Sequence, residues 1–193
     1  MSTQSKRTAA FALCGSFCSF SAVLPQMRAL VDRGWELLPI VSISAATQDT
    51  RFGTAAALRA RLETLTGRVP LDTLQQVEPL GPHKLADAMV IAPATGTTIS
   101  LLAAGISSTP VTMAAKSLLR VSRPIVVAPS TNDGLAGSAP ALAALLQRKN
   151  YYFVPFGQDD SFKKPASLKS DFSLIPDTLE CALRGVQLQP VLL

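Results

Sequence analysis

Charge is scarce in this sequence. Only 16% of its 193 residues are Asp, Glu, Lys or Arg, while 48% are hydrophobic. Acidic residues are the rarer kind, 13 against 18 basic ones, which gives a formal net charge of +5. A surface with so little charge is typical of a chain that is partly covered by another protein chain, so we expect a homo-oligomer.

Aromatic residues are also few, at 6% of the chain, and no basic run is longer than the pair Lys163–Lys164. Proteins that bind nucleic acids combine basic patches with aromatic side chains on which bases stack. We therefore expect no nucleic-acid partner. The basic balance favours a small anionic ligand or an acidic partner protein.

Patterns for metal binding are missing. The chain has three cysteines and one histidine, His83, and Cys14 and Cys18 have no second pair with which to build a zinc site. We predict no metal, and the odd number of cysteines favours a reducing, cytoplasmic location. Buried structural cysteines are the simpler interpretation, and a redox role for Cys14 and Cys18 is the alternative.

No apolar run reaches the roughly 20 residues that a membrane span requires, so we expect no membrane association. Lys6 and Arg7, followed by the apolar run 8–24, imitate a signal peptide, but Gly15 and Ser16 interrupt this run and Pro25 follows it. The run divides instead into a strand and a helix, and we interpret it as part of the folded chain.

Short apolar runs alternate with helical patterns along the sequence. We predict strands at 8–14, 35–42, 89–92, 124–128 and 151–154, with helices between them and a last helix at 175–183. Residues 157–171, which are polar and rich in charge, form a lid or interaction loop in this interpretation. The alternation predicts an α/β fold over residues 1–193: a single-domain Rossmann-like (flavodoxin-like) doubly wound parallel sheet with helices on both faces.

Small and hydroxylated residues follow four of the predicted strands. Ligands of such sheets bind outside the carboxyl ends of the strands, where helix N-termini offer N–H groups to anions. We therefore predict that a phosphate-bearing planar ligand is bound there, with ordinary turns as the alternative. The candidate residues are Gly15, Ser16, Ser42, Ser44, Pro93, Ala94, Thr95, Gly96, Thr97, Thr98, Ser130, Thr131 and Asn132.

The dinucleotide fingerprint G-x-G-x-x-G is absent, and no acidic residue ends the second predicted strand, where a ribose would be held. The Walker pattern is absent too. A mononucleotide phosphate bound by hydroxyls and helix N-termini remains, which favours flavin mononucleotide (FMN) over NAD.

Three of these sites resemble the signature sites of the flavin-containing cysteine decarboxylase-like flavoproteins: Gly15–Ser16, Pro93–Thr98 and Pro129–Asn132. Within that superfamily the chain is most similar to the B subunits of dipicolinate synthase. The segments that carry this resemblance run from end to end of the sequence: 50–53, 78–82, 110–116, 130–134, 152–160, 163–165 and 187–192.

The resemblance implies a flavoprotein that works with the dehydrogenase-like A subunit of dipicolinate synthase, on which NAD(P) is expected. Together they form pyridine-2,6-dicarboxylate from a hydroxylated tetrahydrodipicolinate, with loss of water and two hydrogens, in the mother cell of a sporulating bacterium. The chain departs from the superfamily at Thr97 and Thr131, where Asn and Met are usual. It also lacks the decarboxylases' histidine, whose place falls near Pro79, so decarboxylation is not carried over.

A dicarboxylate substrate requires cations, and we consider Arg51, Lys116, Lys163 and Lys164 as carboxylate ligands, because each lies in a loop or at a helix end near the predicted ligand edge. A solvated surface charge is the alternative for each of them. Asp159 and Asp160 form an acid/base pair or, more simply, order the 157–171 segment or contact a partner. No catalytic residue can be assigned. A scaffold that activates the A subunit, with a relict flavin site, is the second functional hypothesis.

Overall fold

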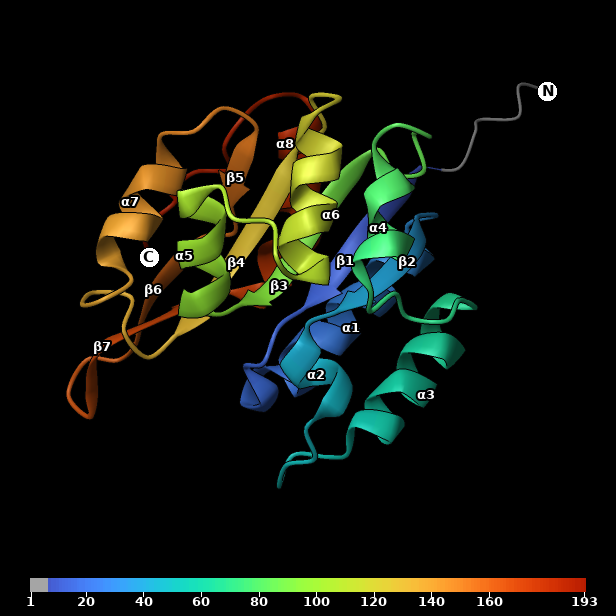
Figure 1. Ribbon diagram of the computed structural model, residues 1–193. Helices are drawn as coiled ribbons and strands as arrows, with labels where there is room; N and C mark the ends of the chain where they lie inside the picture. Colours follow the sequence, from blue (N-terminus) through green and yellow to red (C-terminus); the bar gives the residue numbers. More distant parts are fainter. Residues whose placement is uncertain (1–6) are drawn as a thin grey trace.

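The computed structural model describes residues 7–193 and contains one seven-stranded sheet (Figure 1). Five strands are parallel and lie in the order β2-β1-β3-β4-β5. This is the flavodoxin-like order of a doubly wound sheet, which confirms the predicted fold class. The strands are β1 (Thr8–Leu13), β2 (Glu36–Val41), β3 (Ala88–Ala94), β4 (Ile125–Thr131) and β5 (Tyr151–Phe153).

The apolar runs form strands because both faces of the sheet are buried. Every residue of β3 is buried, and β1 is buried beyond its first residue. One face packs against α1 (Phe20–Asp32), α3 (Ala55–Thr66) and α8 (Ile175–Leu183). The other packs against α4 (Leu74–Val77), α5 (Gly96–Ala104), α6 (Pro110–Leu119) and α7 (Ala139–Leu146). None of the helices within residues 7–193 is long and apolar enough to cross a bilayer.

The prediction of a loop at 157–171 is wrong in its secondary structure. This segment forms most of an antiparallel hairpin, β6 (Phe156–Asp160) and β7 (Lys164–Ser170). Strand β7 pairs with the last two residues of β4, so the sheet is mixed rather than wholly parallel. The apolar pattern does not predict the hairpin, because β6 is largely exposed and its polar residues are stabilised as a strand by hydrogen bonds to β7 rather than by burial of side chains.

Three further boundaries differ from the prediction. The polar segment after β2 contains a short helix, α2 (Ile43–Thr47), for which Ser42 is the N-cap. Strand β3 does not stop at Pro93 but continues through it, at a register irregularity that tolerates a residue without an N–H. Helix α5 begins at Gly96, three residues before the predicted start, because Thr95 caps its first turn.

Candidate functional site

A cavity of about 580 Å³ opens at the carboxyl edge of the parallel strands. The loops after β1, β3 and β4 surround it, and the β6–β7 hairpin closes one side. We call it the strand-end cavity; its lining is Gly15, Ser16, Phe17, Cys18, Ser19, Phe52, Thr95, Gly96, Thr97, Ser130, Thr131, Asn132, Asp133, Asp159, Lys164, Ser167, Leu168 and Lys169. Its volume lies within the range of about 300–1,000 Å³ that is usual for ligand sites.

Most of the predicted ligand residues meet in this cavity. Nine of them line it: Gly15, Ser16, Thr95, Gly96, Thr97, Ser130, Thr131, Asn132 and the cation Lys164. They come from segments far apart in the sequence, which the parallel topology brings to one edge. Their role in binding a ligand stays a prediction.

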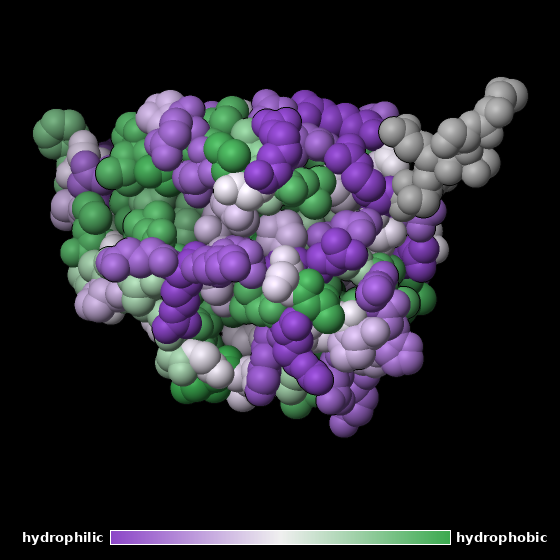
Figure 2. All heavy atoms as spheres, turned by 90° about the horizontal axis from the view of Figure 1, so that it is seen from above, coloured by the Kyte–Doolittle hydropathy of each residue, from purple (hydrophilic) through white to green (hydrophobic). Residues whose placement is uncertain are grey.

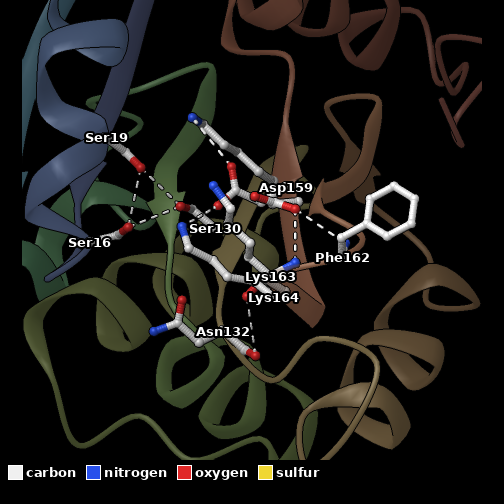
Figure 3. Close-up of polar contacts among 11 residues, drawn as sticks. Ser16, Ser19, Ser130, Asn132, Asp159, Phe162, Lys163 and Lys164 are labelled. Carbon is white, nitrogen blue, oxygen red and sulfur yellow. Dashed lines mark hydrogen bonds and ion pairs between the residues drawn. The ribbon is translucent and has the colours of Figure 1, made fainter.

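Three serine hydroxyls form a closed hydrogen-bonded triangle at one wall of the cavity (Figure 3). Ser130 Oγ lies 2.9 Å from both Ser16 Oγ and Ser19 Oγ, and the latter two lie 3.2 Å apart. Ser16 precedes a short 3-10 turn that leads into α1, and Ser130 lies near the end of β4. The triangle therefore ties the first strand-end loop to the fourth strand and presents hydroxyl groups to the cavity.

The N-terminus of α5 forms another part of the wall. The first N–H groups of a helix have no intrahelical acceptor. Thr95 Oγ1 accepts a hydrogen bond from one of them, the Thr98 amide. Thr98 itself is buried and donates its hydroxyl to Cys14 Sγ at 3.3 Å. Burial raises the pKa of the Cys14 thiol to about 11, so this thiol is neutral at physiological pH. That state does not favour the redox alternative for Cys14.

Asp133 connects the cavity wall to the start of α7 through hydrogen bonds. Its carboxylate accepts hydrogen bonds from Thr131 Oγ1 at 2.5 Å and from Ser138 Oγ at 2.9 Å. These hydroxyl donors hold the Asp133 pKa below its usual range. Gly96 packs directly on this group: a Cβ there would lie 2.4 Å from Ser138 Oγ and 2.7 Å from Asp133 Oδ1. The close approach explains why a glycine begins α5.

The predicted residues outside the lining have local structural roles. Ser42 caps α2 and shares a hydrogen bond with Ser44, whose Oγ lies 2.8 Å from where a Cβ of Gly15 would be. Ser44 therefore packs against the first strand-end loop from behind. Pro93 and Ala94 are buried within β3.

Of the four candidate cations, Lys164 lines the strand-end cavity, and Lys163 lies in the hairpin next to it. Lys164 Nζ reaches Asp159 Oδ2 at 2.8 Å, and Lys169 Nζ lies 3.8 Å from the other oxygen of that carboxylate. The hydrogen bond from Lys164, ahead of the charges of both lysines, holds the Asp159 pKa low. Lys163 lies at the exposed hairpin turn beside Phe162 (Figure 3). Its backbone N–H donates to Asp160, whose carboxylate thereby orders the turn.

Two other cations lie outside the cavity. Arg51 stacks 4.8 Å from the centre of the Phe52 ring, and only that ring reaches the cavity. Lys116 lies in the last turn of α6, and its expected place near the carboxyl edge is wrong because α6 ends at the amino edge of the sheet. Helices in this fold run antiparallel to the strands, so a helix C-terminus marks the far edge.

Several lining residues were not anticipated: Ser19, Asp133, Ser167 and Lys169. Ser19 follows Ser16 by three residues at the start of a helix, which is a spacing that could have suggested a shared ligand surface. Asp133 directly follows Asn132. Ser167 and Lys169 carried no signal, because the hairpin that brings them to the cavity was itself missed.

Comparison with known proteins places this geometry in a family. The sequence profile described as flavoprotein matches residues 2–158. The chain belongs to the flavoprotein family. It is 44% identical over 192 residues to the B subunit of dipicolinate synthase from Bacillus subtilis (strain 168), covering 100% of this chain and 96% of that protein.

Solved structures agree with this placement. The crystal structure of the dipicolinate synthase B subunit from Bacillus halodurans is 41% identical, with a TM-score of 0.89 over 97% of this chain and 96% of that one. The FMN-dependent cysteine decarboxylase SpaF shares the fold at 24% identity, with a TM-score of 0.67 over 92% of this chain and 97% of its own.

Proposed function

We propose that this flavoprotein binds FMN in the strand-end cavity and is the B subunit of a dipicolinate synthase. With the A subunit of that enzyme it would form pyridine-2,6-dicarboxylate from hydroxy-tetrahydrodipicolinate. The observation that carries the proposal is the convergence of the loops after β1, β3 and β4 on one cavity. End-to-end identity of 44% to a dipicolinate synthase B subunit supports the choice of reaction.

The donor groups of the cavity fit a flavin mononucleotide. We assign the phosphate to the wall of Ser16, Ser19 and Ser130, which offers three hydroxyls and carries no charge of its own. The α5 N-terminus is less suitable for an anion, because the ionised Asp133 carboxylate lies against Gly96. The α5 N-terminus, with Thr95 and Thr97, would then contact the ring system or the ribityl chain.

Asn132 suits a ring edge. Its side chain lines the cavity and makes no hydrogen bond to another part of the described chain. An amide offers both a donor and an acceptor, as the pyrimidine edge of a flavin requires. A bound flavin supplies reversible acceptance of two electrons with protons, which matches the two hydrogens lost when the ring becomes aromatic.

The hairpin provides the cations for a dicarboxylate. Lys164 and Lys169 line the cavity and share a single carboxylate, Asp159, so the group carries one net positive charge. A substrate carboxylate could therefore bind there without removing Asp159 from its partners. Lys169 joins Lys164 as a substrate ligand in this proposal, and Lys163 and Arg51 remain at the rim.

Reconstitution with the A subunit tests the proposal. Ser16→Arg and Gly96→Trp fill the strand-end cavity. Thr64→Arg is the matched control for Ser16→Arg, because it adds the same positive charge to the exposed surface of α3. We expect the two cavity variants to lose pyridine-2,6-dicarboxylate formation, while Thr64→Arg retains it. Circular dichroism of each variant establishes that the fold is intact.

A scaffold that activates the A subunit is the second candidate. It is favoured by Thr131, whose hydroxyl donates its proton to Asp133 and therefore cannot donate to a ligand as well. In that case the A subunit would form pyridine-2,6-dicarboxylate at the full rate with folded Ser16→Arg or Gly96→Trp protein. This outcome would remove the catalytic role of the cavity.

We further propose that the chain is a single domain that assembles with copies of itself and with the A subunit, in the cytoplasm of the mother cell. Exposed apolar side chains support the assembly: Phe162 is 96% exposed at the hairpin turn, and Leu192 and Leu193 are each 65% exposed. Light scattering of the purified chain measures its mass, and a monomeric mass would contradict the self-association.

A further inference from the structure

A second cavity, of about 540 Å³, lies at the opposite, amino edge of the sheet. The C-terminal end of α5, one side of α6, the residues that follow α7 and the first residue of β5, Tyr151, line it. Figure 1 shows α5, α6 and α7 on the same face of the sheet. Four basic residues line it, namely Lys116, Arg120, Arg148 and Lys149, and no acidic residue does. We call it the amino-edge cavity. Figure 2 views the molecule from above and shows hydrophilic residues over the middle and right of this face, beside a broader apolar area on the left.

These four cations have no carboxylate partner; among the described residues they share this with Arg28, Arg51, Arg61, Lys84, Lys163 and Arg184, but those six do not line this cavity. Within residues 7–193, none of the four lies in an ion pair, whereas Arg7, Arg33, Arg59, Arg68 and Arg123 all do. The amino-edge cavity therefore concentrates much of the positive excess of the chain. Unpaired cations gathered around a concave surface raise the local concentration of anions.

Capping of the helix C-termini accounts for part of the cluster. Arg148 donates to the carbonyl of Leu102 at 3.0 Å and to that of Ala103, both in the last turn of α5. Lys116 Nζ contacts Ser107 Oγ at 3.3 Å. The side chains of Arg120 and Lys149 make no hydrogen bond in the described part of the chain, so capping does not explain them.

Tyr151 supplies a second, independent observation. Its side chain is only 9% exposed and lines the amino-edge cavity, yet among residues 7–193 its hydroxyl makes no hydrogen bond. No buried side-chain oxygen or nitrogen within residues 7–193 lacks a partner, so the Tyr151 hydroxyl, which has none, must reach solvent. A tyrosine hydroxyl at a cavity lined by cations is therefore free to donate a hydrogen bond to an acceptor oxygen of a ligand. The apolar side chains of Leu102 and Leu119 line the same cavity.

We propose that the amino-edge cavity binds a small organic anion with an apolar body and one or more carboxylate or phosphate groups. Arg120 and Lys149 pair with the anionic groups, and the Tyr151 hydroxyl donates a hydrogen bond to one of their oxygens. Leu102 and Leu119 contact the apolar body. This site lies at the edge opposite to the strand-end cavity, so it does not depend on flavin binding there.

Calorimetric titration of the full chain tests this at low salt. Pyridine-2,6-dicarboxylate and inorganic phosphate are the two probes, and the one that binds more tightly identifies the anionic group. Lys149→Gln and Tyr151→Phe should each weaken binding about tenfold, as expected for the loss of a charge-assisted or buried hydrogen bond. Arg28→Gln removes one exposed charge from α1 and should leave the affinity unchanged. Raising the salt concentration should weaken binding.

Three results would overturn the proposal. One is the absence of binding of either probe at millimolar concentration. Another is a loss of affinity in Lys164→Gln but not in Lys149→Gln, which would place the dicarboxylate in the strand-end cavity. The third is displacement of the probe by a short single-stranded oligonucleotide with tighter binding, which would make the cluster a nucleic-acid surface.

Discussion

Replacing Gly96 by alanine tests the packing beneath the strand-end cavity. Gly96 is the first residue of α5 and does not have a positive φ, so its backbone suits any residue. In a helix without neighbours, alanine would stabilise the fold by up to about 1 kcal/mol over glycine. Sequence propensity alone therefore predicts a more stable protein.

The surroundings predict the opposite sign. The new Cβ would lie 2.4 Å from Ser138 Oγ and 2.7 Å from both Asp133 Oδ1 and Thr131 Oγ1. Asp133 accepts hydrogen bonds from both of these hydroxyls, so relief of the overlap breaks or stretches bonds to an ionised carboxylate. Overpacking costs about 1–3 kcal/mol, and each weakened bond to a charge adds to it. We expect a net loss of about 2 kcal/mol, which for a chain of this size lowers the melting temperature by about 4–8 °C.

Urea unfolding measures this change. Gly105→Ala is the control at the other end of α5, where nothing lies within 4 Å of the added Cβ and only the positive φ of 71° opposes alanine. That variant should lose about 1 kcal/mol and bind FMN as the wild type does. Gly96→Ala should be less stable than the wild type. It should also bind FMN more weakly, because the new Cβ displaces Thr131, which lines the strand-end cavity. A Gly96→Ala protein that is as stable as the wild type and binds FMN equally well would show that the packing around Gly96 does not resist a Cβ.

Three further predictions concern titration and surface contacts. The free energy of unfolding should fall as pH rises from about 9 to about 11, because the pKa of the Cys14 thiol is near its ordinary value of 9.0 in the unfolded chain and about 11 when the thiol is buried. Cys14→Ala should show a flatter dependence of this free energy on pH. Equal slopes for the two proteins would contradict the prediction. Asp133 has a lowered pKa in the folded state, so its contribution to stability is present above the ordinary carboxylate pKa and is lost as pH falls through the folded value. Acid unfolding of Asp133→Asn should therefore depend less on pH than that of the wild type. Arg7→Ala removes a bidentate pair with Glu180 and a contact with the Trp35 ring, and should cost about 1 kcal/mol in thermal unfolding; no measurable cost would show that the exposed pair contributes nothing.

The sequence predicts the parallel core well because both of its faces are buried. Continuous apolar runs identify β1, β3 and β4, and the helical period places α8 at Ile175–Leu183, the bounds that the structure has. The hairpin β6–β7 could not be predicted in this way. Its residues are polar, and they become strands only because Ser130 and Thr131 at the end of β4 provide a partner for Leu168 and Lys169.

The candidate site likewise has a part that the sequence predicts and a part that it does not. Ser16, Gly96 and Ser130 follow predicted strands, so topology alone brings them to one edge. The hydrogen bonds that organise the site are tertiary, as between Ser19 and Ser130 over 111 positions in sequence. No local pattern reports such a contact. The amino-edge cavity has the same origin, since α5, α6 and α7 each contribute one ordinary C-terminus.

Titration of the purified, flavin-free chain with FMN, followed by quenching of flavin fluorescence, is the decisive measurement for the proposed cofactor site. We predict one FMN bound per chain, with riboflavin bound about tenfold or more weakly because it lacks the phosphate that the three serines would hold. Ser130→Ala should weaken the binding of FMN and leave that of riboflavin nearly unchanged. Failure of FMN to bind, or equal affinities for FMN and riboflavin in both proteins, would contradict a phosphate site at the three serines.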